Sequence, residues 1–150
     1  SSATGDWETP AELFAELNIE FGFTLDACAS AGNAKVAKHH DSAEVWSGLV
    51  LPWEGVVWCN PPYGRGIGPW VRKGRESAER GATVVMLLPS RTDTRWWHEE
   101  VMRASEIRFV RGRLRFGNMK TGMPSIYGAP FPSAIVVFRP NYLNRDDAAR

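Results

Sequence analysis

Short apolar runs alternate along this chain with segments of helical spacing, and this alternation restricts the possible folds more than any other feature of the sequence. The runs are bounded by glycine or proline and are predicted to be strands at residues 23–26, 56–59, 83–88, 107–110 and 134–138. Helical segments lie between them at about residues 67–80 and 94–104. Because strands that alternate with helices build a mostly parallel sheet covered on both faces, we predict an α/β fold.

The two ends of this pattern are distinctive. Thr9-Pro10-Ala11-Glu12 has the form of a capping box, so Thr9 is predicted to cap a helix that has Pro10 in its first position and continues to about Glu20. Between residues 110 and 134 glycine and proline recur without a helical pattern. A long loop or irregular hairpin is therefore predicted to join the last two strands, which form an antiparallel end of the sheet.

The length of 150 residues suits one domain, and we expect it to span residues 1–150 with flexible ends at 1–6 and 141–150. No apolar stretch approaches the roughly 20 residues of a membrane span, and residues 1–6 have no signal-peptide core, so we expect a cytoplasmic protein without a membrane partner. Cys28 and Cys59 are expected to be reduced and buried. A monomer and a weak homo-oligomer are both compatible with the sequence.

The net charge of +1 hides a basic stretch in the third quarter of the chain. Its basic residues are Arg91, Arg95, Arg103, Arg108, Arg111, Arg113, Arg115 and Lys120. Such a stretch is typical of a surface that meets a polyanion, and equally of a solvated face that binds nothing. Charge alone does not decide between these two interpretations.

The most specific motif is Asn60-Pro61-Pro62-Tyr63, which directly follows the apolar strand at 56–59. The two prolines stiffen the loop and supply no N–H donors, so the Asn60 side-chain oxygen and the Pro61 carbonyl are presented as acceptors. An open α/β sheet places its ligands at this end of its strands. The alternative is a proline-rich turn after a core strand, with Tyr63 as a surface residue.

Two acceptors at this position suit the amino group of adenine. Its lone pair is delocalised into the ring, and acceptors on the two N–H hydrogens localise it for attack on a methyl sulfonium. Tyr63 would stack on the ring of a base taken out of its duplex. We therefore predict Asn60, Pro61, Pro62 and Tyr63 to be the catalytic residues, with no general base.

Two weaker patterns have simpler interpretations. Gly64-Arg65-Gly66-Ile67-Gly68 lacks the G-x-G-x-x-G form of a dinucleotide loop and is predicted to be a mobile loop beside the substrate. His39-His40-Asp41 suggests a metal site, but adjacent histidines in a strand or loop point apart and no third ligand accompanies them. We therefore predict no metal.

A series of linked motifs along nearly the whole chain resembles the small phage-type DNA N6-adenine methyltransferases, the Dam family. The motifs are Asp6-Trp7-Glu8-Thr9-Pro10, Leu25-Asp26-Ala27-Cys28-Ala29-Ser30, Asn60-Pro61-Pro62-Tyr63, Leu88-Pro89-Ser90-Arg91-Thr92-Asp93-Thr94, Arg111-Gly112-Arg113-Leu114-Arg115-Phe116-Gly117 and Pro130-Phe131-Pro132-Ser133-Ala134. The resemblance implies a Rossmann-like, S-adenosylmethionine-dependent methyltransferase that acts on DNA in a bacterial or phage-infected cell.

The same resemblance implies where the methyl donor binds. The implied cofactor residues are Trp7, Thr9, Pro10, Asp26, Ala27, Cys28, Ser30 and Asn60. The loop after Asp26 is poorer in glycine than the D-P-F-x-G-x-G of amino-methyltransferases, although its small residues still allow close approach. Asp26 would accept from the cationic amino acid moiety of the cofactor. Without the resemblance, Asp26 would equally suit a strand-end cap.

Only about one βαβ unit of roughly 30 residues fits between Asp26 and Asn60. The strands that usually carry the acidic ribose ligand must therefore be shortened or missing, which leaves Asp41 and Glu44 as nearby acids and Asp41 as a candidate ligand. The chain has no room for a separate target-recognition domain, so loops of the catalytic domain must contact DNA. The candidates are Arg65, Arg91, Arg95, Arg111, Arg113 and Arg115. Of Trp96 and Trp97, one is expected to face the core.

Two rival functions remain at this stage. The tetrapeptide Asn60-Pro61-Pro62-Tyr63 also serves enzymes that methylate glutamine side chains in release factors or guanine amino groups in ribosomal RNA. A nucleic-acid-binding or cofactor-binding relative without catalytic activity is the second rival, and the glycine-poor cofactor loop favours it.

Overall fold

The computed structural model describes residues 8–29, 35–36, 38–41, 47–117 and 127–140. The ends at 1–6 and 141–150, which the sequence predicts to be flexible, lie outside these residues. A six-stranded sheet with the order β2-β1-β3-β4-β6-β5 forms the centre of the described structure. Its strands are β1 (Leu25–Ala29), β2 (His39–Asp41), β3 (Val56–Cys59), β4 (Thr83–Pro89), β5 (Glu106–Phe109) and β6 (Ser133–Phe138).

The strand directions agree with a mostly parallel sheet that has an antiparallel end. β1 pairs in parallel with β2 and β3, and β3 pairs in parallel with β4. β6 runs antiparallel to both β4 and β5. It follows that β5 runs in the same direction as β4. The last two strands were predicted to form the antiparallel end together, but only β6 is reversed relative to β4.

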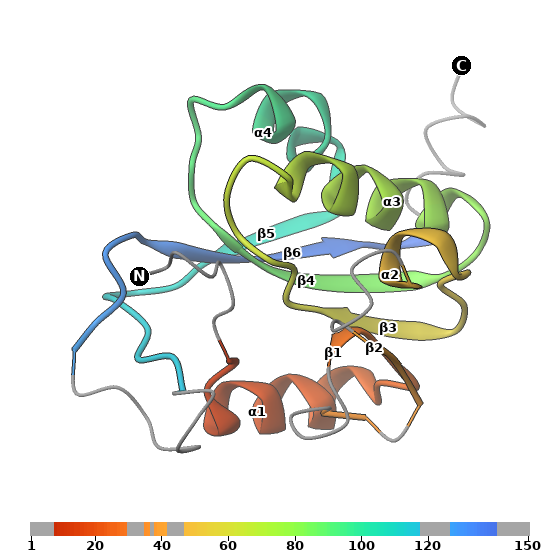
Figure 1. Cartoon of the computed structure of the whole chain (residues 1–150), viewed down its shortest axis with the longest axis horizontal. Coiled ribbons are helices and arrows are strands. Elements are labelled where there is room, and N and C mark those ends of the chain that lie inside the picture. Colours follow the sequence, from red (N-terminus) through yellow and green to blue (C-terminus); the bar gives the residue numbers. More distant parts are fainter. Residues whose placement is uncertain (1–7, 30–34, 37, 42–46, 118–126, 141–150) are drawn as a thin grey trace.

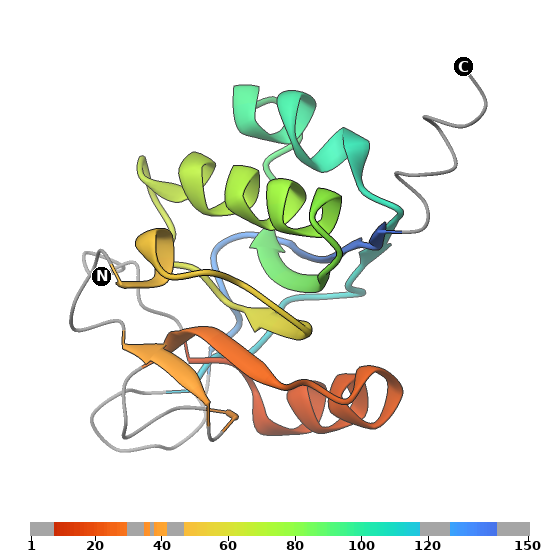
Figure 2. The ribbon, with the colours of Figure 1, turned by 90° about the vertical axis from the view of Figure 1, so that its right-hand side faces the viewer.

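Helices cover both faces of this sheet and make three layers (Figures 1 and 2). One face carries α2, α3 and α4, and the other carries α1. The helices are α1 (Ala11–Phe21), α2 (Ser47–Val50), α3 (Ile67–Glu79) and α4 (Arg95–Glu99), followed by the 3-10 helix η2 (Val101–Arg103). The helix predicted over residues 94–104 is thus divided into α4 and η2.

Side chains that alternate along the strands build one core on each face, as the period of a β-strand requires. On β3, Val57 and Cys59 pack with α3, whereas Trp58 packs with Phe14 and Leu17 of α1. The alternation continues on β4 and β6. The central strands β3, β4 and β6 are therefore buried on both faces.

The N-terminal helix begins one residue later than the capping box predicts. Pro10 occupies the N-cap with an extended ψ of 131°, α1 begins at Ala11, and no side chain caps it. The prediction that Thr9 caps this helix is wrong, because its hydroxyl is engaged elsewhere. The helix ends at Phe21 and is capped by Gly22, whose φ of 66° is the left-handed conformation that glycine adopts without a steric penalty.

The region between β1 and β3 contains the strand β2, which was not among the strands predicted from the sequence. β2 is three residues long and pairs with β1 at the edge of the sheet. This agrees with the expectation of a shortened crossover. Cys59 is buried and Cys28 partly buried, both as free thiols, and Trp97 is buried beside a partly exposed Trp96.

None of the described helices is long and apolar enough to cross a membrane.

Candidate functional site

The carboxyl ends of β1, β3, β4 and β5 lie at one edge of the sheet, because these strands run in the same direction. We call this row of strand ends, which is distinct from an edge strand, the carboxyl edge. The segments that follow these strands start here, among them the Asn60 motif after β3, Arg91 after β4 and Arg111 after β5. Sequence-distant polar side chains are therefore gathered at the position where α/β sheets bind ligands.

Asn60 is held at this edge by Thr9. The Asn60 Nδ2 donates a hydrogen bond to the Thr9 Oγ1 over 3.0 Å, although 51 positions separate the two residues. Thr9 is only 5% exposed, whereas Asn60 is half-buried. The nitrogen end of the Asn60 amide is thus directed to Thr9, and its oxygen end is turned away from Thr9.

Residues 8–10, which we call the N-terminal strap, connect three loops of the carboxyl edge. The Glu8 carbonyl accepts from the Gly117 N–H at 2.9 Å, in the segment after β5. The Glu8 carboxylate lies 3.7 Å from the Lys35 ammonium, in the segment after β1. Together with the bond to Asn60 after β3, these contacts tie the strap to the ends of three strands.

Asp26 of β1 is buried and holds the chain that follows its own strand. Its two carboxylate oxygens accept from the backbone N–H groups of Cys28 at 3.2 Å and Lys35 at 3.0 Å. Burial raises the pKa of this carboxyl to about 6, and the two amide donors offset the rise only in part. The carboxylate is therefore a buried anionic group whose charge would be stabilised by a nearby cation.

Tyr63 lies in an aromatic cluster. Its ring makes edge-on contacts with Phe116 and Phe131, at centroid distances of 6.2 and 5.3 Å. Its hydroxyl donates to the Leu87 carbonyl at 3.0 Å, and burial raises its pKa well above the ordinary value. These contacts fix the plane of the ring, so Tyr63 is not a loosely held surface residue.

The predicted DNA-binding arginines are all exposed and all lie in segments at or beyond the carboxyl ends of strands. Arg91 lies over the Phe131 ring at 5.8 Å, and Arg113 donates to the Ala129 carbonyl at 3.3 Å. Arg95 pairs with Glu99 on α4. Arg65, Arg111 and Arg115 have no hydrogen-bond or ion-pair partner among the residues that the structure describes.

Arg108 also belongs to the basic stretch of the sequence, but the fold uses it differently. It pairs with Glu20 at 2.6 Å and with Glu106 at 2.5 Å, and it lies over the Phe21 ring. Its charge is therefore matched within the fold.

The remaining predicted site residues are placed as follows. Ala27 is buried in the core on the α3 face, Pro61 is buried, and Pro62 is half-buried. Trp7, Ser30 and Glu44 lie outside the described residues, and so does the side chain of Asp41, whose backbone ends β2. The described part of the chain contains no group of three or more His, Cys, Asp or Glu side chains arranged to hold a metal ion.

Sequence reasoning missed several contributors to this edge. Phe116 and Phe131 were noted only as members of longer motifs, and their contact with Tyr63 joins segments far apart in the chain. Glu8 was noted only within the motif at residues 6–10, and its ion pair with Lys35 was missed because a single ion pair between loops leaves no pattern in a sequence.

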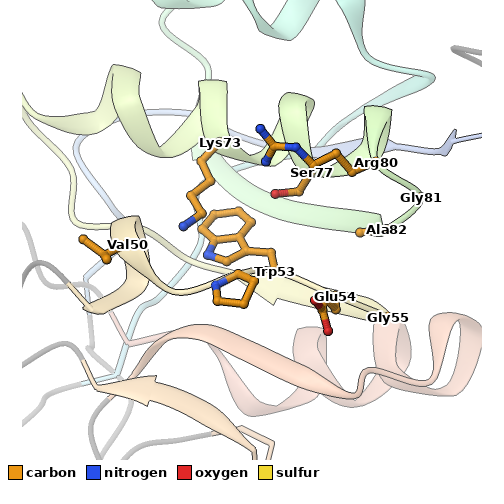
Figure 3. Close-up of a pocket in the computed structure, with 10 residues that line it drawn as sticks. Val50, Trp53, Glu54, Gly55, Lys73, Ser77, Arg80, Gly81 and Ala82 are labelled. Carbon is orange, nitrogen blue, oxygen red and sulfur yellow. The ribbon is translucent and has the colours of Figure 1, made fainter.

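A separate pocket of about 430 Å³ lies at the opposite edge of the sheet (Figure 3). It is lined by the turns that precede β3 and β4 and by the C-terminal part of α3. Lys73 extends over the Trp53 ring there and donates to the carbonyls of Leu49 and Leu51 at 2.6 and 2.5 Å. The pocket contains none of the predicted site residues.

Comparisons with known proteins show that this chain is similar to DNA N-6-adenine-methyltransferases. The family model described as DNA N-6-adenine-methyltransferase (Dam) matches residues 1–148. A DNA N-6-adenine-methyltransferase of Haemophilus phage HP1 is 34% identical over 138 residues, which cover 89% of this chain and 78% of that protein. A DNA N-6-adenine-methyltransferase of Escherichia phage T1 is 37% identical over 112 residues, which cover 72% of this chain and 45% of that protein.

Proposed function

The chain belongs to the DNA N-6-adenine-methyltransferase (Dam) family, and we propose that it transfers a methyl group from S-adenosylmethionine to the N6 amino group of adenine in DNA. The observation that carries this proposal is the fixed Asn60 amide directly after β3, in a chain that matches the family over residues 1–148.

The chemistry requires the adenine amino nitrogen to become a nucleophile. The Asn60 side-chain oxygen and the Pro61 carbonyl accept hydrogen bonds from its two N–H hydrogens and draw the lone pair out of the ring. Both acceptors lie on a loop stiffened by Pro61 and Pro62, so they need little reorganisation during the reaction. This arrangement uses no metal ion and no general base.

Tyr63 supplies the surface on which the flipped adenine stacks. Its contacts with Phe116 and Phe131 hold the ring in one plane, and its hydroxyl is anchored to Leu87. A base that leaves its duplex loses stacking energy, and a fixed aromatic ring restores part of it.

The residues of the first strand fit a cationic methyl donor. S-adenosylmethionine supplies a methyl group on a positively charged sulfur and also carries an ammonium group. Asp26 is a buried carboxylate with a raised pKa, so a cation bound close to it would relieve the cost of burying its charge. Trp7, Thr9, Pro10, Ala27, Cys28, Ser30 and Asp41 complete the proposed cofactor-binding segments.

DNA would approach the carboxyl edge. Arg65, Arg91, Arg95, Arg111, Arg113 and Arg115 are exposed in its segments and would neutralise phosphates around the flipped base. The loops of the catalytic domain would thus perform the work of a separate target-recognition domain.

The test is methyl transfer from labelled S-adenosylmethionine to DNA, RNA and a glutamine-containing protein substrate in parallel. We expect label in DNA, recovered as N6-methyladenine after digestion to nucleosides. Label in RNA or protein without label in DNA would support one of the rival methyltransferases. Cofactor and DNA binding without any transfer would support the non-catalytic relative.

A further inference from the structure

The side chain of Thr9 is used in an unexpected way. Its sequence context predicts a helix cap, yet α1 has no side-chain cap, and the Thr9 hydroxyl instead bonds to Asn60. Thr9 is 5% exposed and lies in the N-terminal strap, which is also held by Gly117 and Lys35 through Glu8. The backbone that carries this hydroxyl is therefore held by the segments that follow β1 and β5.

This position matters because the Asn60 oxygen can act on the adenine amino group only if its side chain is held in one place. A hydroxyl both donates and accepts hydrogen bonds, so it can hold an amide at either end. In the structure the Thr9 hydroxyl accepts from the Asn60 Nδ2, which leaves the Asn60 oxygen turned away from Thr9.

We propose that Thr9 is a positioning residue that holds the Asn60 side chain through its Nδ2 and so fixes the position of its oxygen for the reacting amino group. The inference rests on the proposed adenine methyl transfer. Because Thr9 also lies in a proposed cofactor-binding segment, the effect assigned to its hydroxyl is on the rate of transfer at saturating cofactor.

The test compares Thr9→Val, which keeps the shape and removes the hydroxyl, with Thr9→Ser, which keeps the hydroxyl. Single-turnover methyl transfer is measured per cofactor-binding site, together with the affinities for S-adenosylmethionine and DNA. Thr9→Val should lower the rate of transfer at saturating S-adenosylmethionine about fivefold to tenfold, the factor that corresponds to one net neutral hydrogen bond, while DNA affinity stays within about twofold of the wild type. Thr9→Ser should keep most of the wild-type rate.

Thr24→Val is the matched control. The Thr24 hydroxyl also bonds to the β3 region, but at the other end of the strand, where it contacts the Val56 backbone. Its loss should lower the melting temperature and leave the rate per binding site unchanged. Thr9→Ala provides a second hydroxyl-free variant in case valine does not fit, and it should be as slow as Thr9→Val.

Three results would overturn the inference: a wild-type rate in the hydroxyl-free variants, a rate loss that disappears at saturating cofactor, or a Thr9→Ser enzyme as slow as Thr9→Val. If the wild-type enzyme transfers no methyl group to adenine in DNA, the proposed function itself is wrong and the inference falls with it.

Discussion

The two edges of the central sheet use polar side chains in opposite ways. The amino edge is the opposite row of strand ends, where β3 and β4 begin. There Thr24 accepts from the Val56 N–H at 3.0 Å and contacts the Val56 carbonyl at 3.2 Å, so the hydroxyl satisfies the backbone of the adjacent strand. Tight turns at Gly55 and Gly81, with φ values of 78° and 114°, lead into β3 and β4. At the carboxyl edge, the polar contacts join side chains and loops from remote parts of the chain.

This difference indicates what each edge contributes. The amino edge uses the Thr24 hydroxyl to satisfy the backbone of the adjacent strand, which is a contribution to stability. The carboxyl edge orders long loops around Thr9, Asp26 and Asn60, which has a larger cost in conformational entropy and leaves a buried carboxylate with a raised pKa. Polar groups held at such a cost are expected at a functional site.

The largest expected effect is the loss of catalysis in Asn60→Ala. An acceptor directed at the reacting nitrogen is comparable to an oxyanion-hole donor, so the rate of methyl transfer should fall about 100-fold to 1,000-fold. Cofactor affinity, measured by calorimetry, should change much less. Near-normal turnover on adenine-containing DNA would show that the carboxyl edge does not place its catalytic acceptor at Asn60.

The next effect concerns the pH dependence of stability through Asp26. Its pKa is raised in the folded protein to about 6 from the ordinary value of 3.8, so the folded state binds the proton more tightly than the unfolded state. The resulting contribution to stability is fully present below about pH 4 and is lost as the pH rises through 6.

The unfolding free energies of the wild type and Asp26→Asn, measured between pH 4 and 8, check this prediction. The stability of the wild type relative to the variant should fall by roughly 2 to 3 kcal/mol over that range. Cofactor affinity of the wild type should rise over the same range, because a bound cation favours the ionised carboxylate. A stability difference independent of pH would contradict the raised pKa of Asp26.

Two substitutions of Tyr63 separate base stacking on its ring from the anchoring of its hydroxyl. Tyr63→Ala removes the ring, and since stacking of one base contributes about 1–3 kcal/mol, turnover per DNA-binding event should fall about tenfold to 100-fold. Tyr63→Phe keeps the ring and loses only the bond to the Leu87 carbonyl, so it should be mildly less stable and nearly as active. Equal activity losses in the two variants would rule out stacking as the main role of the ring.

The sequence predicted the strands of the sheet better than the side-chain contacts at the ends of those strands. Apolar runs such as Thr83–Pro89 indicate strands because burial on both faces imposes a composition that is visible locally. β2 was missed because its three residues, His-His-Asp, are polar and pair with β1 through the backbone.

The site could be predicted where it coincides with a motif and not where it depends on tertiary contacts. Asn60-Pro61-Pro62-Tyr63 was found because two consecutive prolines directly after a strand are unusual and leave the neighbouring oxygens as acceptors in a stiff loop. The role of Thr9 was misjudged because the local capping pattern competes with a bond to a residue 51 positions away. Charge alone places Arg108 in the same basic stretch as Arg111, yet Glu20 and Glu106 neutralise Arg108 in the fold.

A change at the amino edge should lower stability and spare catalysis. Gly55→Ala introduces a Cβ at a φ of 78°, and this Cβ would lie 2.6 Å from the Thr24 Oγ1. We expect a loss of roughly 1–2 kcal/mol in unfolding free energy, with unchanged turnover per folded molecule. Gly81→Ala is the matched control, because its φ is also positive but its Cβ would meet nothing within 4 Å, so it should be the milder change. A loss of turnover in folded Gly55→Ala would contradict the division between the edges.

The smallest expected effect is on the salt dependence of DNA binding, and it compares arginines from the two edges. Arg111 and Arg115 are exposed after β5 at the carboxyl edge, whereas Arg80 is exposed beside Gly81 at the amino edge. Each arginine that neutralises a phosphate contributes about 0.9 to the slope of log affinity against log salt. Combined Arg111→Ala and Arg115→Ala should therefore flatten the slope by nearly two units, with cofactor binding and melting temperature unchanged, because neither side chain has a partner among the described residues.

Arg80→Ala should leave the slope at its wild-type value, since the amino edge faces away from the catalytic loops. A flattened slope in Arg80→Ala, with a wild-type slope in the double variant, would place the DNA path at the amino edge and reverse the assignment of the two edges.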